Sequence, residues 1–240
     1  MQTSARYWAV IPAAGGGTRM GSGRPKQYLP LRGRTLIEWS LAPFLEAEWI
    51  DGIVLVLPKS DSEFAQLPIA RHPRIVPVVG GAARAESVLA GLRAVAAHTR
   101  AFRDVRVLVH DAARPCVQAS DIDRLCEEAD DGHGGILALP VTDTLKRGKP
   151  SRQYTEIAET VDRALYWRAQ TPQLFGLEKL MRALQECEAR GLEVTDEASA
   201  MERAGYRPRL VRGRESNIKV TYPEDLQLAE FWLQRQAEQP

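Results

Sequence analysis

A glycine-rich segment near the N-terminus, followed by two spaced cations, has the residue types needed to bind a chain of phosphates. The segment reads VIPAAGGGTRMGSGRPKQY over residues 10–28. Its three consecutive glycines, residues 15–17, let backbone N–H groups approach phosphate oxygens that larger side chains would hold away. Arg19 can grip such oxygens as a planar fork, while Lys26 supplies a compact positive charge. This pattern predicts a loop that wraps a triphosphate.

Two well-known phosphate-binding loops do not fit this segment. A Walker loop requires G-x-x-x-x-G-K-[ST], whereas Lys26 lies between Pro25 and Gln27. A dinucleotide-binding fingerprint requires G-x-G-x-x-G, and Met20 stands where the third glycine belongs. Taken alone, the loop could also be a glycine-rich turn without a ligand, because glycine clusters often mark turns. The two cations argue against that alternative.

Two further segments place small and polar residues directly after predicted strands. In GGAARAES, residues 80–87, the glycines permit close approach and Ser87 offers a hydroxyl to a base edge, although Gly-Gly is also an ordinary turn between a strand and a helix. In HDAARP, residues 110–115, Asp111 could contact a ribose or magnesium and Arg114 a phosphate. The same two residues could instead form a local salt bridge.

Three other polar residues are candidate site residues, although each also has an ordinary structural interpretation. NIKVTYPEDL places Lys219 in a short apolar strand, from which it can reach a ligand or snorkel to solvent. Thr171 in QTPQ and Thr195 in TDEAS are residue types common in turns and helix N-caps, and Thr195 is expected to cap a helix over 196–204. The four histidines share no motif, so we interpret them as structural or exposed.

The elements that must position these residues alternate between strands and helices. Strands are expected at residues 7–11, 52–57, 75–79, 105–109 and 134–141, and helices at residues 35–48, 85–98, 177–190 and 224–236. The early part of this order repeats βαβ units, which indicates an α/β, Rossmann-like fold with a mainly parallel sheet and helices on both faces. Strand carboxyl ends then share one edge, where ligands of open α/β sheets bind. The three loops described first lie at that edge.

The pattern changes after residue 141. From 143 to 163, polar residues alternate with β-prone ones around a Gly-Lys-Pro turn, which predicts a hairpin that leaves the main sheet. A protruding arm with little core of its own needs support, and a second subunit is the expected one. We therefore expect a single domain over residues 1–240, with a dimerisation β-arm at about 142–167.

Composition excludes several classes of protein. Among the 240 residues, 32 Lys and Arg oppose 31 Asp and Glu, so a net charge of +1 gives no overall field that attracts nucleic acid. No stretch approaches 18 apolar residues, and the N-terminus shows no leader-like apolar region. The three cysteines lack zinc-site or disulfide-framework spacing. We expect a cytoplasmic protein without nucleic-acid or membrane partners.

Seven motifs, in their order along the chain, resemble the 2-C-methyl-D-erythritol 4-phosphate cytidylyltransferases of the non-mevalonate isoprenoid pathway. They are AAGGGTRM…PKQY, GGAARAESV, HDAARP, DTLK, QTPQLF, TDEASAME and NIKVTYPEDL, and the match runs from about Val10 to Glu230. HDAARP and TDEASA are much more specific than the glycine loop. The resemblance implies a nucleotidyltransferase that joins CTP to 2-C-methyl-D-erythritol 4-phosphate and releases pyrophosphate, with Mg²⁺ or another divalent cation.

The resemblance also implies roles for individual residues. The CTP-binding set would be Ala13, Ala14, Gly15, Gly16, Gly17, Thr18, Arg19, Lys26, Gly81, Ala82, Ser87, Asp111 and Ala112. The polyol phosphate would contact Arg114, Thr144, Arg163, Thr171, Thr195 and Lys219. Arg19 and Lys26 would stabilise the transition state, and Arg163 and Lys219 would position the attacking phosphate. Asp111 is the candidate metal ligand. Because the arm crosses to a partner subunit in the family, Thr144 and Arg163 would complete the neighbouring site of a homodimer.

The residue types are consistent with this chemistry. A phosphate monoester is largely dianionic at neutral pH, since its second pKa lies near ~6, so it can attack without a general base. The site must align two polyanions and neutralise charge at phosphorus, which Arg, Lys and Mg²⁺ can do. Residue chemistry alone leaves a ribitol 5-phosphate cytidylyltransferase open, as well as a nucleotide-binding regulator that has lost turnover. An NAD-dependent dehydrogenase is disfavoured by the missing third glycine and by the two loop cations.

Overall fold

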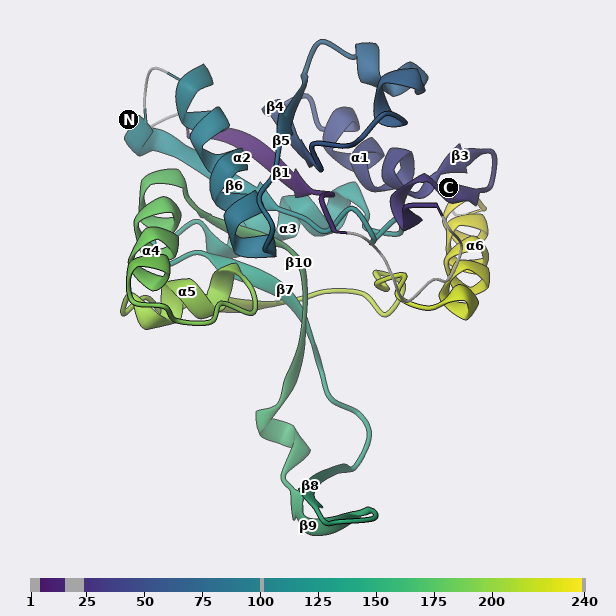
Figure 1. Ribbon diagram of the computed structural model, residues 1–240, viewed down its shortest axis with the longest axis vertical. Coiled ribbons are helices and arrows are strands. Elements are labelled where there is room, and N and C mark those ends of the chain that lie inside the picture. Colours follow the sequence, from purple (N-terminus) through teal and green to yellow (C-terminus); the bar gives the residue numbers. More distant parts are fainter. Residues whose placement is uncertain (1–4, 16–23, 100–101, 239–240) are drawn as a thin grey trace.

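The computed structural model describes residues 5–15, 24–99 and 102–238 and has a seven-stranded sheet at its centre (Figure 1), in the order β11-β7-β10-β6-β1-β4-β5. The strands are β1 (Arg6–Pro12), β4 (Ile50–Leu57), β5 (Ile75–Val79), β6 (Val105–Val109), β7 (Gly135–Pro140), β10 (Trp167–Gly176) and β11 (Arg209–Arg212). β6, β1, β4 and β5 are parallel, and so are β11 and β7, whereas β10 runs antiparallel to both of its neighbours. The expectation of a mainly parallel α/β sheet is confirmed.

Helices cover both faces of the sheet. One face carries α1 (Leu36–Glu46) and α3 (Ala119–Ala129), and the other carries α2 (Arg84–His98), α4 (Leu177–Ala189) and α5 (Glu197–Arg203). The central strand β1 shows why: Ala9 and Ile11 belong to one apolar cluster, while Trp8 and Val10 belong to the other. Both faces of β1 are therefore buried, as expected of a parallel strand.

The remaining elements flank this core. α6 (Pro223–Ala237) packs in a third apolar cluster that includes Leu36, the first residue of α1. The short pieces are strands β2 (Pro30–Leu31) and β3 (Arg34–Thr35) and the 3-10 helices Lys26–Tyr28, Phe64–Gln66, Pro68–Arg71, Phe102–Asp104 and Arg163–Leu165. Within the described ranges no helix is long and apolar enough to cross a membrane.

Local sequence explains how α1 begins and why α2 can lie close to the sheet. Thr35 caps α1, because its hydroxyl accepts from the backbone N–H of Glu38 while the Glu38 carboxylate accepts from the Thr35 N–H at 2.7 Å. α2 lies close against the sheet at Gly91, where a Cβ atom would stand 2.6 Å from Cγ1 of Val10. Arg84 is the first residue of this helix.

Sequence patterns missed β10, β11 and α3 and gave two wrong assignments near the site. Lys219 was expected in a strand, but the segment between β11 and α6 contains none. Thr195 was expected to cap α5, but the N-cap is Asp196, whose carboxylate accepts from the backbone N–H of Ser199 at 2.9 Å. A carboxylate at this position also favours the positive end of the helix dipole.

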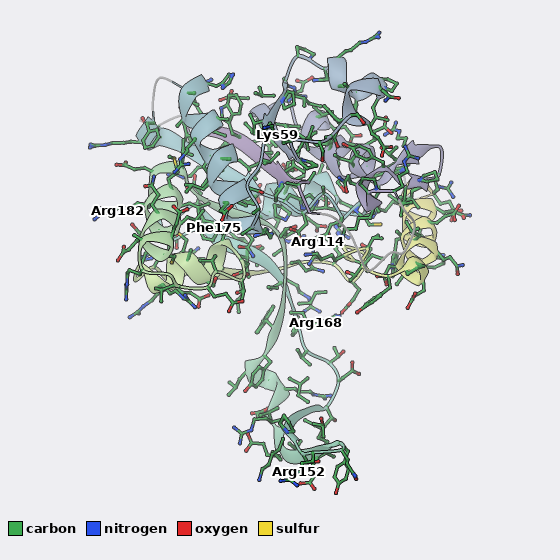
Figure 2. The ribbon with its side chains drawn as sticks, viewed as in Figure 1. Lys59, Arg114, Arg152, Arg168, Phe175 and Arg182 are labelled. Atoms are coloured by element: carbon green, nitrogen blue, oxygen red, sulfur yellow. The ribbon has the colours of Figure 1, made fainter. Side chains whose placement is uncertain are left out.

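The hairpin arm projects from the body of the molecule (Figure 1). It includes β8 (Leu145–Pro150) and β9 (Thr155–Val161), and Arg152 and Arg168 mark its tip and its base in Figure 2. The predicted Gly-Lys-Pro turn is wrong: Gly148 lies within β8 at a register shift, and the turn comes at residues 151–154. Gly148 reads as a turn residue, but in a strand glycine often marks such an irregularity.

Candidate functional site

A pocket of ≈ 180 Å³ opens where β1, β5 and β6 end, and residues of all three predicted loops line it. The first loop contributes Ala13, Ala14, Gly15, Lys26 and Gln27, the second Gly81, Ala82, Ala83, Arg84 and Ser87, and the third Asp111, Ala112 and Ala113. Lys219 joins them from the C-terminal segment. The three loops, whose lining residues lie up to about a hundred positions apart in sequence, face one cavity because the parallel strands before them end on the same edge.

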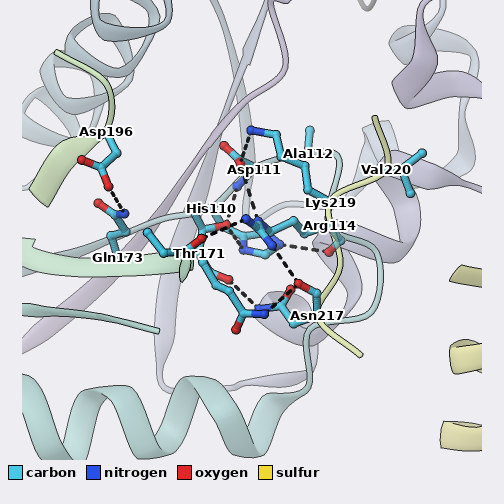
Figure 3. Close-up of polar contacts among 12 residues, drawn as sticks. His110, Asp111, Ala112, Arg114, Thr171, Gln173, Asp196, Asn217, Lys219 and Val220 are labelled. Carbon is cyan, nitrogen blue, oxygen red and sulfur yellow. Dashed lines mark hydrogen bonds and ion pairs between the residues drawn. The ribbon is translucent and has the colours of Figure 1, made fainter. Parts of the chain in front are cut away.

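Asp111 is the electrostatic centre of this pocket (Figure 3). Its Oδ1 lies 3.1 Å from Nη2 of Arg84, and its Oδ2 lies 2.8 Å from Nζ of Lys219 and 3.7 Å from Nε of Arg114. Burial alone would raise the pKa of this carboxyl group, but the three cations outweigh burial and hold the pKa well below its ordinary value. Asp111 is therefore ionised at neutral pH.

Arg84 connects Asp111 to a second carboxylate. The two guanidinium nitrogens of Arg84 reach Oε1 and Oε2 of Glu197 at 2.5 and 3.1 Å, and the side chain of Glu197 is completely buried at the start of α5. Burial raises the pKa of Glu197, and the Arg84 guanidinium opposes that shift. Burial lowers the pKa of Arg84, but the neighbouring Glu197 and Asp111 carboxylates raise it by more, so the pKa lies above its ordinary value. Arg84 thus remains a cation held by two carboxyl groups.

The β6 end is joined to β10 behind Asp111 by a hydrogen-bonded chain. The Thr171 hydroxyl accepts from the backbone N–H of Asp111 at 3.0 Å and lies 2.9 Å from Nδ1 of His110. The other ring nitrogen of His110 lies 3.2 Å from the Arg114 carbonyl, which can only accept, so Nε2 carries the proton. Nδ1 is consequently the acceptor, and the hydroxyl proton of Thr171 points to it. Burial lowers the pKa of His110 to about 4, which keeps the ring neutral.

Buried side chains also hold the segment that carries Lys219. The Asn217 carbonyl accepts from Nη1 of Arg114 at 2.7 Å and from Nε2 of Gln170 at 3.2 Å, and the Asn217 side chain donates to the Thr171 carbonyl at 2.8 Å. Tertiary hydrogen bonds therefore hold this segment in place without a strand ladder. Arg114, predicted to contact phosphate, is buried and binds backbone carbonyls, and its Nε lies 3.7 Å from Asp111.

The two lysines predicted to act on phosphate converge on one place. Nζ of Lys26 donates to the carbonyl of Val220 at 3.1 Å, and Val220 directly follows Lys219 in the chain. The neighbouring Gln27 donates to the carbonyl of Ala13 at 3.1 Å, which ties the two ends of the glycine-rich segment to each other. Both ends of that segment and the C-terminal segment therefore form one wall of the pocket.

The base-binding candidates form a tight turn of their own. The Ser87 hydroxyl donates to the Gly81 carbonyl at 3.2 Å, and the Glu86 carboxylate accepts from the backbone N–H of Ala82 at 2.8 Å. These bonds fix the loop before any ligand is bound. A fixed loop presents backbone groups to a base without having to be ordered on binding.

Several predicted site residues lie elsewhere. Thr144 and Arg163 belong to the arm, where the Arg163 guanidinium donates to the Thr142 carbonyl, and neither lines the pocket. Thr195 is exposed beside the N-cap of α5, and Thr171 is buried behind Asp111. Four candidates lie outside the described residues: Gly16, Gly17, Thr18 and Arg19.

Sequence reasoning missed Arg84, Glu197 and Asn217 as parts of this site. Arg84 and Glu197 stand inside the motifs GGAARAES and TDEASA, where they read as the polar start of a helix. Arg84 begins α2 and Glu197 begins α5, and their side chains meet only because both helices cover the same face of the sheet. His110 was interpreted as structural or exposed, and its complete burial bears out the structural interpretation.

The described residues do not fit a protein-held divalent cation. Within the described ranges, no three His, Cys, Asp or Glu side chains gather to hold a metal. The candidate ligand Asp111 points both of its oxygens at nitrogen cations. Mg²⁺ prefers several oxygen donors in octahedral geometry, and this carboxylate is already neutralised.

Comparison with known proteins agrees with this geometry. The family model described as 2-C-methyl-D-erythritol 4-phosphate cytidylyltransferase matches residues 7–235. Proteins of that name from Mannheimia succiniciproducens and Cronobacter sakazakii are 51% and 50% identical, over 95% of this chain in both cases and 96% and 93% of theirs. The crystal structure of that enzyme from Francisella tularensis superposes with a TM-score of 0.79 at 34% identity, covering 95% of this chain and 99% of the other. The chain belongs to the 2-C-methyl-D-erythritol 4-phosphate cytidylyltransferase family.

Proposed function

We propose that this chain transfers the cytidylyl group of CTP to 2-C-methyl-D-erythritol 4-phosphate, a step in the formation of isoprenoid precursors. A phosphate oxygen of the polyol phosphate attacks the α-phosphorus of CTP. The bond from that phosphorus to the oxygen bridging to the β-phosphate breaks, and pyrophosphate leaves. The observation that carries the proposal is the single pocket in which Lys26 and Lys219 converge beside the nucleotide-binding loops.

We assign CTP to the part of the pocket built by the first two loops. Ala13, Ala14 and Gly15 would face the phosphates and ribose, while Gly81, Ala82 and Ser87 would face the cytosine. The preformed turn around Gly81 supports this assignment, because it offers backbone groups at fixed positions. Asp111 and Ala112 would meet the ribose, where an ionised carboxylate is a strong acceptor for a hydroxyl.

The chemical step requires cations rather than a general base. The attacking phosphate is already largely dianionic, so the pocket has to bring two anions together and stabilise charge at phosphorus. We assign the transition-state role to Lys26, with Arg19 from the undescribed part of the loop, and the positioning of the attacking phosphate to Lys219. A lysine is suited to this work because its compact charge can follow phosphate oxygens during the displacement.

We propose that the divalent cation expected for the family arrives on the phosphate oxygens of CTP. The residues that the structure describes around the pocket offer it no set of oxygen donors. Phosphate-bound Mg²⁺ keeps several of its own waters and needs few protein ligands.

We further propose a homodimer in which the arm, residues 142–167, completes the partner's site. Tyr154, Ile157 and Leu165 of the arm are 63%, 69% and 79% exposed, which is a large apolar area for an isolated hairpin. In such a dimer Thr144 and Arg163 would meet the polyol phosphate held by Lys219 and Thr195 of the other subunit, with the buried Arg114 and Thr171 supporting that site from behind. On this proposal the chain is one nucleotidyltransferase domain whose arm contacts the partner subunit. We expect it to work in the cytoplasm.

The experiment that tests the reaction is pyrophosphate release from CTP and Mg²⁺ with two alternative acceptors. Release with 2-C-methyl-D-erythritol 4-phosphate and none with ribitol 5-phosphate is the expected result. Release with ribitol 5-phosphate alone would move the chain to the other polyol, and CTP binding without release to either acceptor would indicate a regulator.

A further inference from the structure

Four charged side chains from four parts of the chain form an alternating row across the pocket. Glu197 lies at the start of α5, Arg84 at the start of α2, Asp111 after β6 and Lys219 in the C-terminal segment. The nitrogen-to-oxygen distances along the row are 2.5 Å, 3.1 Å and 2.8 Å. Three of these residues line the pocket, whereas Glu197 stands behind Arg84 and is fully buried.

Only an arginine can occupy the second place in this row. Arg84 uses both terminal nitrogens on the two oxygens of Glu197 and turns Nη2 to Asp111 as well. A planar guanidinium can donate to two carboxylates at once from separate nitrogens, whereas a lysine has a single ammonium nitrogen for both. The contact therefore fixes the direction in which the Asp111 carboxylate presents its other oxygen.

That other oxygen is the one that holds Lys219. The Lys219 side chain is 43% exposed, so without Asp111 its long stem would sample many rotamers over the pocket. Asp111 itself has little freedom, because Thr171 holds its backbone and Arg84 holds its carboxylate.

We infer that Arg84 is a positioning residue that sets the place of the Lys219 ammonium through Asp111, and that Glu197 acts by holding Arg84. This inference rests on the proposed function, since Lys219 is assigned there to the attacking phosphate. Glu197 is fully buried and pairs with Arg84, outside the lining of the pocket, so its influence on the reaction passes through Arg84. Gln173 holds the first turn of α5, where Glu197 lies. Its side-chain N–H donates to the Asp196 carboxylate at 2.9 Å, and its side-chain oxygen accepts from the backbone N–H of Ala198 at 2.9 Å.

The test compares three variants with a matched control. The variants are Arg84→Gln, Glu197→Gln and the double variant, and the control is Arg6→Gln, which removes an exposed arginine that pairs with Asp51 at 2.7 Å near the start of β1. Initial rates of pyrophosphate release are measured against 2-C-methyl-D-erythritol 4-phosphate at saturating CTP, with circular dichroism and thermal unfolding to verify the fold.

Arg84→Gln should lower kcat/KM for the polyol phosphate at least tenfold with a raised KM, because Lys219 loses its fixed position. The double variant should be no worse than Arg84→Gln, since Glu197 acts only through Arg84. A loss confined to kcat would indicate merely less folded enzyme and would overturn the inference. Multiplied effects in the double variant would overturn it too. Should Arg84→Gln fail to fold because Glu197 is left unpaired, the double variant carries two amides and still tests the KM.

A second readout does not depend on turnover. The carboxyl group of Asp111 faces Arg84 from α2, Lys219 from the C-terminal segment and Arg114 from its own loop, with neutral His110 beside it. In protein labelled with ¹³C at the aspartate carboxyls and assigned with Asp111→Asn, Arg84→Gln should move the Asp111 titration to higher pH, and Arg6→Gln should leave it in place. An unmoved titration refutes the positioning role. Absence of turnover in the wild type, with the expected titration shift, would refute the proposed function alone.

Discussion

Replacing Thr171 by valine should destabilise the protein by about 3 kcal/mol. Valine has the shape of threonine without the oxygen, so packing is kept while the hydrogen bonds to His110 Nδ1 and to the Asp111 N–H, 2.9 and 3.0 Å long, are lost. All three residues are buried, and water cannot replace the hydroxyl without space. Leaving a buried donor or acceptor unsatisfied costs roughly 1–3 kcal/mol per group, and two groups are affected here.

The measurement is thermal unfolding of ligand-free protein at one fixed concentration, because the proposed dimer would make the midpoint depend on concentration. For a chain of this size a loss of 1 kcal/mol lowers Tm by roughly 2–4 °C, so Thr171→Val should lower it by about 6–12 °C. Thr171→Ser is the matched control. It keeps the oxygen and loses one buried methyl group, which should cost about 1 kcal/mol.

Equal midpoints for Thr171→Val and Thr171→Ser would refute the reasoning. They would mean that the hydroxyl contributes nothing at the junction of β6 and β10, and that Thr171 stabilises only through its methyl group. The tautomer assigned to His110 would then lose its support as well, since it depends on the same hydrogen-bonded chain.

Three further outcomes are expected. His110 is buried and has a pKa of about 4 in the folded protein, whereas in the unfolded chain it binds a proton below pH 6.5. The free energy of unfolding therefore falls as the pH drops from 6.5 to about 4. The wild type should lose about 3 kcal/mol more than His110→Asn between these pH values in urea titrations, and equal losses would contradict the burial argument. Lys26→Ala and Lys219→Ala should each slow pyrophosphate release by roughly two orders of magnitude with the fold retained, and normal turnover in either would exclude that lysine from the reaction. A mixed dimer of Lys219→Ala and Arg163→Ala subunits should regain one working site, because one pairing joins an intact pocket to an intact arm. Inactive but well-folded mixed dimers would exclude a site shared between subunits.

The nucleotide side of the site could be predicted from the sequence because it depends on strand direction. Apolar runs marked β1, β5 and β6, and the loops after them had to meet on one edge of a parallel sheet. Each of those loops also carried a local signal: glycines, or the Asp-Ala-Ala-Arg run that ends with Arg114. Order along the chain and local residue type were sufficient.

The middle of the sheet could not be predicted, because β10 does not look like a strand. Its centre, QTPQ, reads as a turn, yet Gln170, Thr171 and Gln173 are buried. Each finds its hydrogen-bond partners in a different part of the chain: the C-terminal segment, the end of β6 and the start of α5. Partners that distant leave no periodic pattern in the sequence.

The choice between Thr195 and Asp196 as the cap of α5 shows the same limit at a single position. Both residue types cap helices well, so propensity gives no decision. Gln173 decides it, because its amide holds the Asp196 carboxylate at 2.9 Å and so fixes where the helix begins. Thr195 is consequently left exposed, one residue before the cap.

The excess of cations around Asp111 explains how Lys219 can be held in advance and still be available to a phosphate. If Lys219 were the sole partner of this carboxylate, moving the lysine to a substrate would leave a buried anion unpaired, which costs several kcal/mol. Arg84 and Arg114 also face Asp111, at 3.1 and 3.7 Å, and both stay in place when the lysine moves, because Glu197 and the Asn217 carbonyl hold them. The carboxylate therefore keeps two cationic neighbours throughout. Lys219 is the exposed member of the three, and so it is the one that an incoming phosphate can take.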